Sequence, residues 1–305
     1  MRRLSLHMVK ELAREDERIC FIGSDLGFGV MEDFPDLSRL FREGISEQHI
    51  IGMAAGLAAD GKIVYLNTIA SFLVRRCLEQ IYLDLCLSKA KVRLIASGGG
   101  LVYAPLGLTH LAPDDFSLLR AMPNMTILAP CDAEEMRRLM PLTLELDGPV
   151  YIRLAKGGDT VVSTNFSHPS YVVGKSVFFR HGGDALFITT GIAAQIALDA
   201  ASLLERDGIQ AAVLHCHTLN PLDQEAIAQA AEHTKTVITV EEHVRVGGLG
   251  TAVAEIFMDK GITSSLIRAA LPVHFFTEHG SQAHILEKYG LSGPALAQMV
   301  KDACS

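Results

Sequence analysis

Short apolar runs alternate with longer amphipathic stretches along the first half of the chain. The apolar runs predict strands at residues 18–23, 62–67, 92–97, 125–130 and 149–154. The amphipathic stretches between them predict helices at residues 46–59, 72–89, 114–121 and 132–146. This alternation is typical of βαβ units, in which a parallel sheet lies between two layers of helices.

The same alternation resumes after an interruption near residue 160. Gly157, Gly158 and the polar stretch 159–170 break the pattern, so this region is the best candidate for a linker. Beyond it, strands are predicted at 184–191, 209–219, 236–243 and 265–271, and helices at 192–206, 223–232 and 249–260. We therefore predict two three-layer α/β domains in series, at residues 1–160 and 173–305, joined by a linker at 161–172.

Small residues recur on one face of the first long helix that this pattern predicts. Gly52, Ala55, Gly56 and Ala59 follow one another at spacings of three and four. A glycine inside a helix costs about 1 kcal/mol relative to alanine, so two of them call for a reason. Close approach of another backbone would supply one, from the same domain or from another chain. Glu47 heads this helix, where the helix dipole favours a carboxylate whether or not it has a function.

The composition changes this picture only by excluding some classes of protein. Hydrophobic residues make up 49% of the chain and charged residues 20%, which predicts a large core and little disorder. A net charge of −8 without a basic patch argues against nucleic acid as a partner. No apolar run has the length of a membrane span or the features of a signal peptide. The six cysteines form no CxxC pair, so we predict buried thiols in a cytoplasmic protein.

Residues 40–86 resemble the pyrimidine-binding domain of transketolases and of 1-deoxyxylulose-5-phosphate synthases. The segment holds a glycine-isoleucine-x-glutamate element ending at Glu47, then a small-residue helix, a strand and an arginine-containing helix. The similarity continues through residues 107–135, 148–158, 184–191, 219–223 and 237–255. The chain is thus identified as a member of this family over its whole length. The resemblance implies a pyrimidine-binding domain followed by a smaller transketolase C-terminal domain.

The resemblance gives Glu47 a chemical role. In thiamine-diphosphate enzymes this carboxylate hydrogen-bonds a ring nitrogen of the cofactor's aminopyrimidine and favours its imino tautomer. The imine then removes the proton from the thiazolium carbon, and the resulting ylid attacks a ketose carbonyl. A carboxylic acid that shares a proton in this way is favoured by burial at a dry, apolar interface. Glu47 is therefore predicted to be both catalytic and cofactor-binding.

The arginine-containing helix is implied to supply further cofactor contacts. Phe72 matches the segment whose aromatic side chain stacks on the aminopyrimidine, and Arg76 matches an arginine common in the synthases. The family's usual aromatic positions fall nearer Leu73 and Leu78. Core packing of Phe72 and a solvated position for Arg76 therefore remain alternatives.

The substrate contacts implied by the resemblance lie on loops and at strand ends. His110 matches a histidine that reaches the substrate's oxygens, and such a loop histidine suits acid–base chemistry. Arg153 matches an arginine that grips the substrate's phosphate or distal end, and Ser24 falls where transketolases place a phosphate contact. Weaker candidates for cofactor or substrate contacts are His49, Arg2, Arg3 and Lys156.

Two departures from the family pattern concern the substrate. The position four residues before His110 is acidic in the family and is Leu106 here. The basic residues that help to hold a phosphate are replaced by the sequence SGGG at residues 97–100. An acceptor other than an ordinary sugar phosphate, such as a modified or nucleotide-linked sugar, is the hypothesis that follows.

The sequence contains no GDG…N motif, with which the family binds Mg²⁺ and the cofactor's diphosphate. The resemblance then implies that a separate N-terminal subunit supplies this motif. We expect an α₂β₂ heterotetramer that dimerises through this chain, binds thiamine diphosphate and Mg²⁺, and transfers a two-carbon ketol unit from a ketose to an aldose. The alternatives are the beta subunit of a 2-oxo acid dehydrogenase, an enzyme similar to the deoxyxylulose-phosphate synthases, and a catalytically silent regulatory subunit.

Three short motifs are interpreted as structural. His215 and His217 fall on one face of a predicted strand, but without a third ligand at a suitable spacing they predict no metal site. The glycines of residues 247–250 lack the spacing of a dinucleotide-binding loop and predict a turn between a strand and a helix. Residues 241–243, with the sequence EEH, resemble a recurring structural element of the family's last domain.

Overall fold

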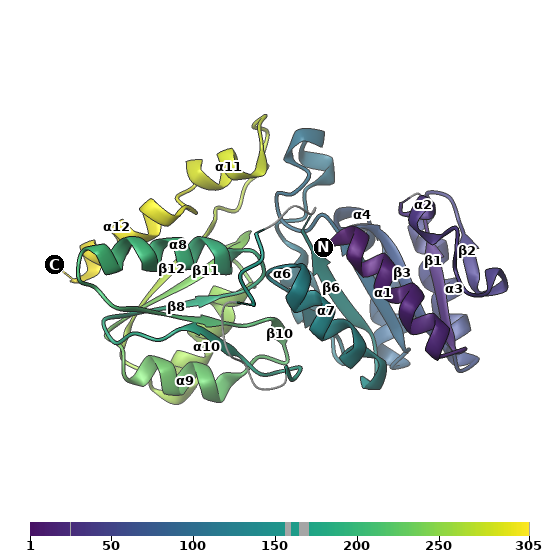
Figure 1. Cartoon of the computed structure of the whole chain (residues 1–305), viewed down its shortest axis with the longest axis horizontal. Coiled ribbons are helices and arrows are strands. Elements are labelled where there is room, and N and C mark those ends of the chain that lie inside the picture. Colours follow the sequence, from purple (N-terminus) through teal and green to yellow (C-terminus); the bar gives the residue numbers. More distant parts are fainter. Residues whose placement is uncertain (25, 156–159, 165–170, 305) are drawn as a thin grey trace.

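The computed structural model of the chain describes residues 1–24, 26–155, 160–164 and 171–304. It confirms two α/β domains, each with a mainly parallel sheet between layers of helices (Figure 1). The predicted linker at 161–172 lies partly outside the described residues, and its exact bounds stay a prediction. No helix in the described part of the chain has the length and apolar character needed to cross a membrane.

The first sheet has the strand order β10-β5-β6-β4-β3-β1-β2. Its strands are β1 (Ile19–Gly23), β2 (Leu40–Arg42), β3 (Ile63–Ile69), β4 (Val92–Ser97), β5 (Thr126–Leu128), β6 (Val150–Leu154) and β10 (Thr218–Asn220). All neighbouring pairs are parallel except β10 with β5. The central strands β1, β3, β4 and β6 are buried along their whole length, as expected of a sheet covered on both faces.

Helices cover both faces of this sheet. On one face lie α1 (Arg2–Glu15) and α7 (Ala133–Leu142), whose buried side chains share a core with the sheet. On the other lie α3 (Glu47–Ala59), α4 (Ala70–Arg76), α5 (Leu78–Gln80), α6 (Asp115–Arg120) and the π-helix η2 (Ile81–Leu87). Short helical turns complete the domain: α2 (Phe28–Met31), η1 (Leu37–Arg39), η3 (Ala104–Leu106), η4 (Leu108–His110) and η5 (Thr143–Glu145).

The single helix predicted at residues 72–89 is wrong. The chain forms α4, breaks at Cys77, where φ is −111°, and continues as α5 and the wider π-helix η2. Both parts still bury apolar side chains, so the hydrophobic pattern survives the break. π-Helices often mark functional sites. Helix α1 was not predicted either.

The second sheet has the order β12-β11-β8-β9-β7. Its strands are β7 (Val177–Arg180), β8 (Ala185–Thr189), β9 (Ala211–His215), β11 (Thr236–Val244) and β12 (Ser265–Leu271). Helices α8 (Ala193–Arg206), α11 (Gln282–Lys288) and α12 (Gly293–Cys304) share a core with one face. Helices α9 (Gln224–Glu232) and α10 (Leu249–Lys260) pack on the other. The antiparallel edge strand β7 has no counterpart in the sequence prediction.

The predicted strand at residues 209–219 is wrong, because the chain changes sheet within it. β9 ends at His215 in the second sheet, and β10 then pairs antiparallel with β5 of the first. The amide of Ala129 donates to the carbonyl of His217 at 2.8 Å where the chain crosses over. A short strand from the second half thus covers an edge of the first sheet that would otherwise be open.

Buried polar groups hold the two domains together. Arg153, at the end of β6, is 7% exposed and lies 3.0 Å from the Asp115 carboxylate, while its guanidinium donates to the backbone carbonyl of Glu242 at 2.9 Å. The Glu242 carboxylate accepts from the amide of Leu101 and from Gln282, both at 2.7 Å. A Cβ at Gly100 would lie 2.4 Å from Glu242 Cδ, so the junction leaves no room for a side chain there.

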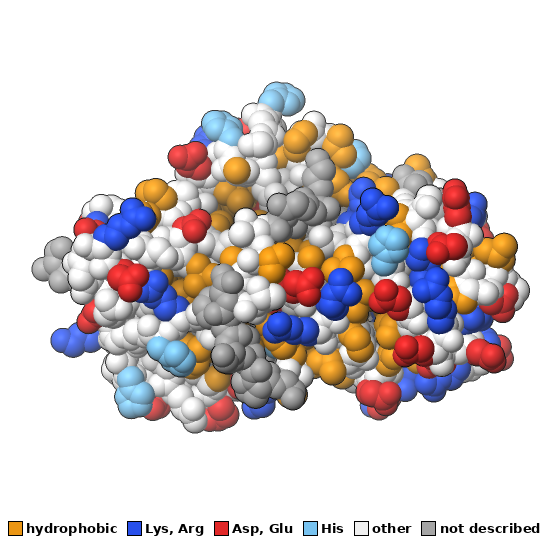
Figure 2. Space-filling model, viewed as in Figure 1, with side chains coloured by type: hydrophobic (Ala, Val, Ile, Leu, Met, Phe, Trp, Pro, Cys, Tyr) orange, Lys and Arg blue, Asp and Glu red, His pale blue; other side chains and the backbone are white. Residues whose placement is uncertain are grey.

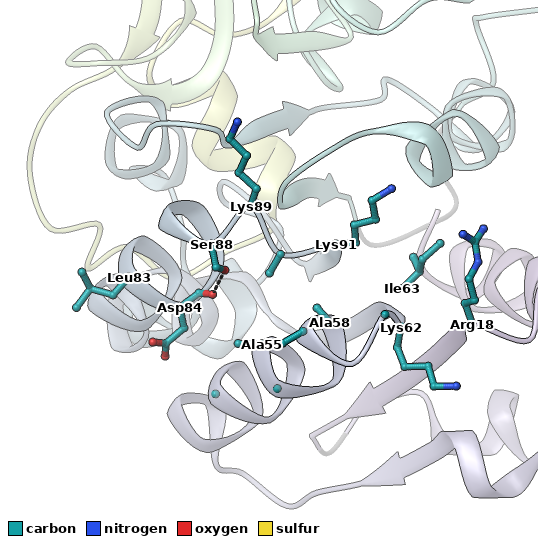
Figure 3. A pocket seen from close by; sticks show the side chains of 15 residues that line it. Arg18, Ala55, Ala58, Lys62, Ile63, Leu83, Asp84, Ser88, Lys89 and Lys91 are labelled. Carbon is teal, nitrogen blue, oxygen red and sulfur yellow. Dashed lines mark hydrogen bonds between the residues drawn. The ribbon is translucent and has the colours of Figure 1, made fainter.

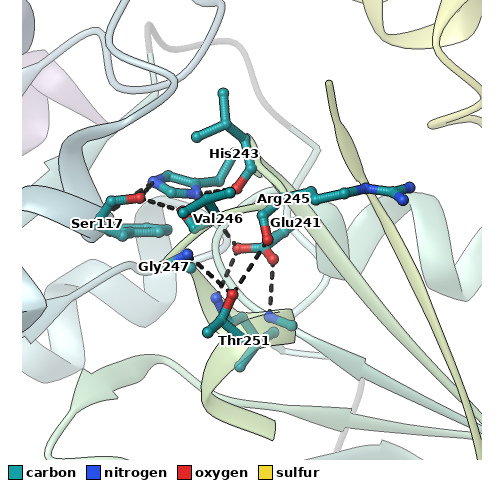
Figure 4. A network of polar contacts seen from close by, with 12 residues as sticks. Ser117, Glu241, His243, Arg245, Val246, Gly247 and Thr251 are labelled. Atoms are coloured by element: carbon teal, nitrogen blue, oxygen red, sulfur yellow. Dashed lines mark hydrogen bonds and ion pairs between the residues drawn. The ribbon is translucent and has the colours of Figure 1, made fainter. Parts of the chain in front are cut away.

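Of the remaining residues of the EEH motif, Glu241 binds within its own domain and His243 contacts the first domain. Glu241 accepts from the amides of Leu249 and Gly250 at the start of α10, at 2.7 and 2.8 Å. His243 reaches across to Ser117 of α6, whose amide and hydroxyl lie 3.3 Å from its Nε2 (Figure 4). The three side chains therefore have structural partners, in keeping with the interpretation of this motif.

The junction predicts a pH-dependent difference in stability. Burial raises the pKa of Glu242 from 4.5 to about 7. Between those values the unfolded chain loses this proton while the folded chain keeps it, so the wild type loses stability as the pH rises. Glu242→Gln removes this loss. We expect its free energy of unfolding, relative to the wild type, to rise by at most roughly 3 kcal/mol between about pH 4 and about pH 8.

Urea unfolding of both proteins across this range measures the difference. Glu232→Gln, on an exposed residue of α9, is the control and should follow the wild type at each pH. If the free energy of unfolding of Glu242→Gln varied with pH in parallel with that of the wild type, the Glu242 carboxyl would titrate alike in the folded and unfolded states.

Candidate active site

Glu47 is the first residue of α3 and is buried, with 1% of its surface exposed. Ile50, Ile51 and Ala54 of the same helix point into the core and fix the position of its first turn. Such burial of a carboxylate is costly unless other groups hydrogen-bond it or balance its charge. The partners of Glu47 therefore define the site.

Two strand ends hold one side of the Glu47 carboxylate. Thr68, at the end of β3, donates its hydroxyl to Glu47 Oε1 at 3.4 Å. Ser24, which follows β1, donates to the Thr68 hydroxyl at 3.0 Å. Because β1 and β3 are parallel neighbours, their carboxyl ends bring these two hydroxyls together beside α3. Ser24 thus contacts Glu47 through Thr68, a residue that the sequence analysis missed.

The other side of the carboxylate faces the cation of Arg76, which in turn lies over an aromatic ring. Arg76 of α4 forms an ion pair with Glu47 Oε2 and remains 43% exposed. Its guanidinium carbon lies 4.8 Å from the centre of the Phe72 ring, and that ring meets the imidazole of His110 edge-on at 5.1 Å. Contacts therefore link Glu47, Arg76, Phe72 and His110, four of the residues predicted to be catalytic or cofactor-binding.

The other residues predicted to contact cofactor or substrate do not belong to this linked group of four side chains. Arg153 is occupied at the domain junction, and no described contact joins it to Glu47. His49 is exposed and lies 3.7 Å from Glu43, while Arg2 donates to the hydroxyl of Tyr103 at 3.2 Å. Arg3 is exposed, and Lys156 lies outside the described residues. A phosphate-binding role for these residues stays a prediction.

The loop before His110 is apolar and open. Leu106 is 57% exposed and Leu108 is 42% exposed, whereas His110 is half-buried with its Nδ1 3.0 Å from the hydroxyl of Thr109. Next to it, Leu108, Thr109 and Phe275 line a hollow of about 480 Å³ between the two domains. Leu106 therefore stands on the surface at the position where the family carries an acidic residue.

The small-residue face of α3 is not covered by its own domain. Gly52, Gly56 and Ala59 are exposed, and a Cβ at either glycine would meet nothing within 4 Å. They line a groove of about 990 Å³ between α3 and η2 (Figure 3). The exposed side chains of Leu83 and Leu87 belong to the same helix η2. This face is thus a close-contact surface without a covering element among the described residues.

Comparisons with known proteins agree with this fold. Residues 1–158 match the model of the transketolase pyrimidine-binding domain, and residues 174–296 match that of the transketolase C-terminal domain. One of the subunits of an apulose-4-phosphate transketolase from Phocaeicola vulgatus is 38% identical over 92% of this chain and 90% of its own. A 1-deoxy-D-xylulose-5-phosphate synthase of Heliobacterium modesticaldum is 34% identical over 95% of this chain, but over only 45% of its own length.

A solved structure of a split gene transketolase, an inactive tetramer of beta chains, is also similar, with a TM-score of 0.89 and 34% identity over 99% of this chain and 97% of that one. The chain belongs to the transketolase family, whose members are transferases that use thiamine diphosphate. Its similarity extends over nearly the full length of separately encoded transketolase subunits.

The ion pair at the site predicts a measurable coupling. Arg76→Gln leaves the buried Glu47 carboxylate without its cation, which should destabilise the chain by about 1–2 kcal/mol, a value reduced for the exposure of Arg76. The double variant that also carries Glu47→Gln should lose less unfolding free energy than the two single variants lose together, because no charge is then left unpaired. Urea unfolding of the four proteins measures this coupling.

Arg75→Gln is the matched control for this cycle. Arg75 pairs with Asp114 at 2.5 Å, and both side chains are more than a third exposed. Its replacement should therefore cost less than about 1 kcal/mol. Strictly additive effects of the Glu47 and Arg76 substitutions would mean that the two side chains do not interact in solution.

Proposed function

We propose that this chain is the C-terminal subunit of a split transketolase, which transfers a two-carbon ketol unit from a ketose to an aldose. The observation that carries the proposal is the buried Glu47 carboxylate, in contact with Arg76 and Thr68 at the mouth of an uncovered helix. A silent subunit would have no need to keep a carboxylate in such a costly position.

The donor set of the site fits the aminopyrimidine half of thiamine diphosphate. Glu47 offers a carboxylate to a ring nitrogen, and Phe72 lies next to it across Arg76 as an apolar surface for a ring. When bound, the cofactor supplies a carbon nucleophile that attacks a ketose carbonyl. Glu47 holds a proton at the ring nitrogen, and the surrounding apolar helix excludes water from it. His110 then donates hydrogen bonds to the substrate's oxygens.

The cofactor's diphosphate and Mg²⁺ are left to a partner subunit in this proposal. The cluster of Glu47, Arg76, Phe72 and His110 offers one carboxylate, that of Glu47, and this carboxylate is already paired with Arg76. Mg²⁺ binding needs several oxygen ligands in an octahedral arrangement. An N-terminal subunit with a GDG…N motif would supply them, and would cover the site from the side of the half-exposed Arg76.

The groove between α3 and η2 supports dimerisation through this chain. Its helix face consists of glycine and alanine, so a second helix backbone can approach closely. This exposed apolar helix face, together with Leu83 and Leu87 of η2, is typical of a surface that another chain covers, and Arg18, Lys62, Lys89 and Lys91 line the rest of the groove. We therefore propose an α₂β₂ assembly, in which two copies of this chain pair at the groove and two N-terminal subunits complete the active sites. A cytoplasmic location stays a prediction.

The apolar loop at Leu106 bears on the substrate. An acidic residue at this place would be expected to hydrogen-bond a hydroxyl of an ordinary aldose phosphate, and leucine cannot. Thr109, His110 and the exposed Leu106 and Leu108 favour an acceptor with fewer hydroxyls or with a modification at this point. The Phocaeicola relative is named for a particular sugar phosphate, apulose-4-phosphate.

The proposed function is tested with the chain reconstituted with its N-terminal partner and loaded with cofactor and Mg²⁺. Glu47→Gln removes the proton-holding group, so ketol transfer from a ketose to an aldose should fall by at least about 100-fold. Glu43→Gln, on a surface carboxylate close in sequence, is the control and should leave the rate unchanged. Product formation by chromatography measures both.

The same assay separates the alternatives. Release of carbon dioxide from a 2-oxo acid, without ketol transfer, would instead indicate a 2-oxo acid dehydrogenase subunit or an enzyme similar to the deoxyxylulose-phosphate synthases. Full activity of the Glu47→Gln enzyme would leave the regulatory subunit as the better interpretation.

The assembly is tested by filling the groove. Gly56→Leu places a side chain where the isolated chain has open space, so the fold should tolerate it and gain up to about 1 kcal/mol of helix stability. The same side chain should block close approach of a second helix, and light scattering should show monomers of this subunit. Ser202→Leu, on an exposed position of α8, is the control. An unchanged oligomer would place the contact between copies elsewhere.

A further inference from the structure

A group of side chains with metal-ligating atoms is buried where the two domains meet. Cys131 lies between β5 and α7, Glu135 lies in the first turn of α7, and His215 ends β9 of the second sheet. All three are 0% exposed. The cysteine sulfur, a carboxylate oxygen and an imidazole nitrogen all lie within 4.8 Å of one another.

The surrounding hydrogen bonds hold these ligand atoms in place. Glu135 Oε2 accepts from the backbone amide of Cys131 at 2.6 Å and lies 3.0 Å from His215 Nε2. On the far side of the imidazole, Nδ1 lies 3.1 Å from the hydroxyl of Thr189. A histidine that ligates a metal usually bonds its second ring nitrogen to such an oxygen, which fixes the tautomer and the ring orientation.

Two buried atoms in this region have no hydrogen-bond partner among the described residues. They are Oε1 of Glu135 and Nε2 of His217, whose side chains are both 0% exposed. An unpaired buried polar atom costs about 1–3 kcal/mol, so such atoms are rare without a ligand. An ion pair between Glu135 and His215 would use only Oε2 and would leave Oε1 unpaired.

We propose that Cys131, Glu135 and His215 form a structural zinc site that joins the two domains. Sulfur, imidazole and carboxylate ligands together select Zn²⁺ over Mg²⁺ or Ca²⁺. His217 does not belong to this group of ligand atoms, and its ring centre lies 6.5 Å from that of His215, so a water molecule would complete the four ligands of the ion. The proposal is independent of the proposed function, since it concerns the fixed arrangement of the two domains.

Binding requires the thiol of Cys131 to release its proton to solvent. His215 and His217 have no third ligand at a suitable spacing in the sequence, which is why the pattern predicts no metal site there. The further ligand Glu135 lies on α7, 80 residues before His215 in the sequence, so no short-range spacing pattern predicts it.

The test uses the full chain after removal of metals with a chelator. Addition of Zn²⁺ should give one bound ion per chain by elemental analysis and a higher melting temperature, whereas Mg²⁺ should give neither. Replacement of Zn²⁺ by Co²⁺ should give the near-ultraviolet charge-transfer band of a cobalt thiolate. Stoichiometric binding should be lost in both Cys131→Ser and His215→Gln.

Cys216→Ser is the matched control, because Cys216 is also buried but its sulfur faces the hydroxyl of Ser176 at 3.3 Å. It should bind Zn²⁺ as the wild type does. The proposal is overturned if the wild type binds no stoichiometric Zn²⁺, or if both ligand variants bind it unchanged. Should either variant fail to fold, absence of the thiolate band in the wild-type cobalt protein would decide against the site.

Discussion

The parallel pairing of β1 with β3 is the constraint on which the site depends. Parallel strands bring their carboxyl ends to one edge of a sheet, and the loops and helices that follow start there. Ser24 and Thr68 stand at these two ends, and α3 begins close enough for the Thr68 hydroxyl to reach Glu47. Without that edge, a buried carboxylate at the head of α3 would have no neutral donor and only the half-exposed Arg76 as a partner.

The domain order, the central strands and the candidate cluster could be predicted from the sequence. Runs such as 92–97 are apolar because both faces of the sheet are covered, so their pattern marks a strand directly. Glu47, Phe72, Arg76 and His110 were named from the family resemblance, and contacts link them in the structure, while their roles in a site stay predictions. The burial of five cysteines as free thiols also followed from their scatter.

Other features depend on contacts that no local pattern contains. Thr68 looks like any polar residue at a strand end, and only its distance to Glu47 reveals its part in the site. Arg153 was expected to face a substrate, yet Asp115 and the Glu242 carbonyl surround it because the second domain packs there. The glycines at 98–100 have a structural reason as well, since Tyr103, Arg153 and Glu242 fill the space that a side chain at Gly98, Gly99 or Gly100 would need. Figure 2 shows charges of both signs interspersed over one face of the molecule, as the composition suggests.

The crossing of β10 into the first sheet has a consequence for synthesis of the chain. The first sheet is complete only when residues 218–220 have left the ribosome, well after all its other strands. Until then the edge of β5 is open, and β9 of the second sheet must be made before that edge is covered. The two domains therefore do not fold independently in order of synthesis, because the first domain completes its sheet only after part of the second has been made. A nascent chain stalled between them would carry an unpaired strand edge.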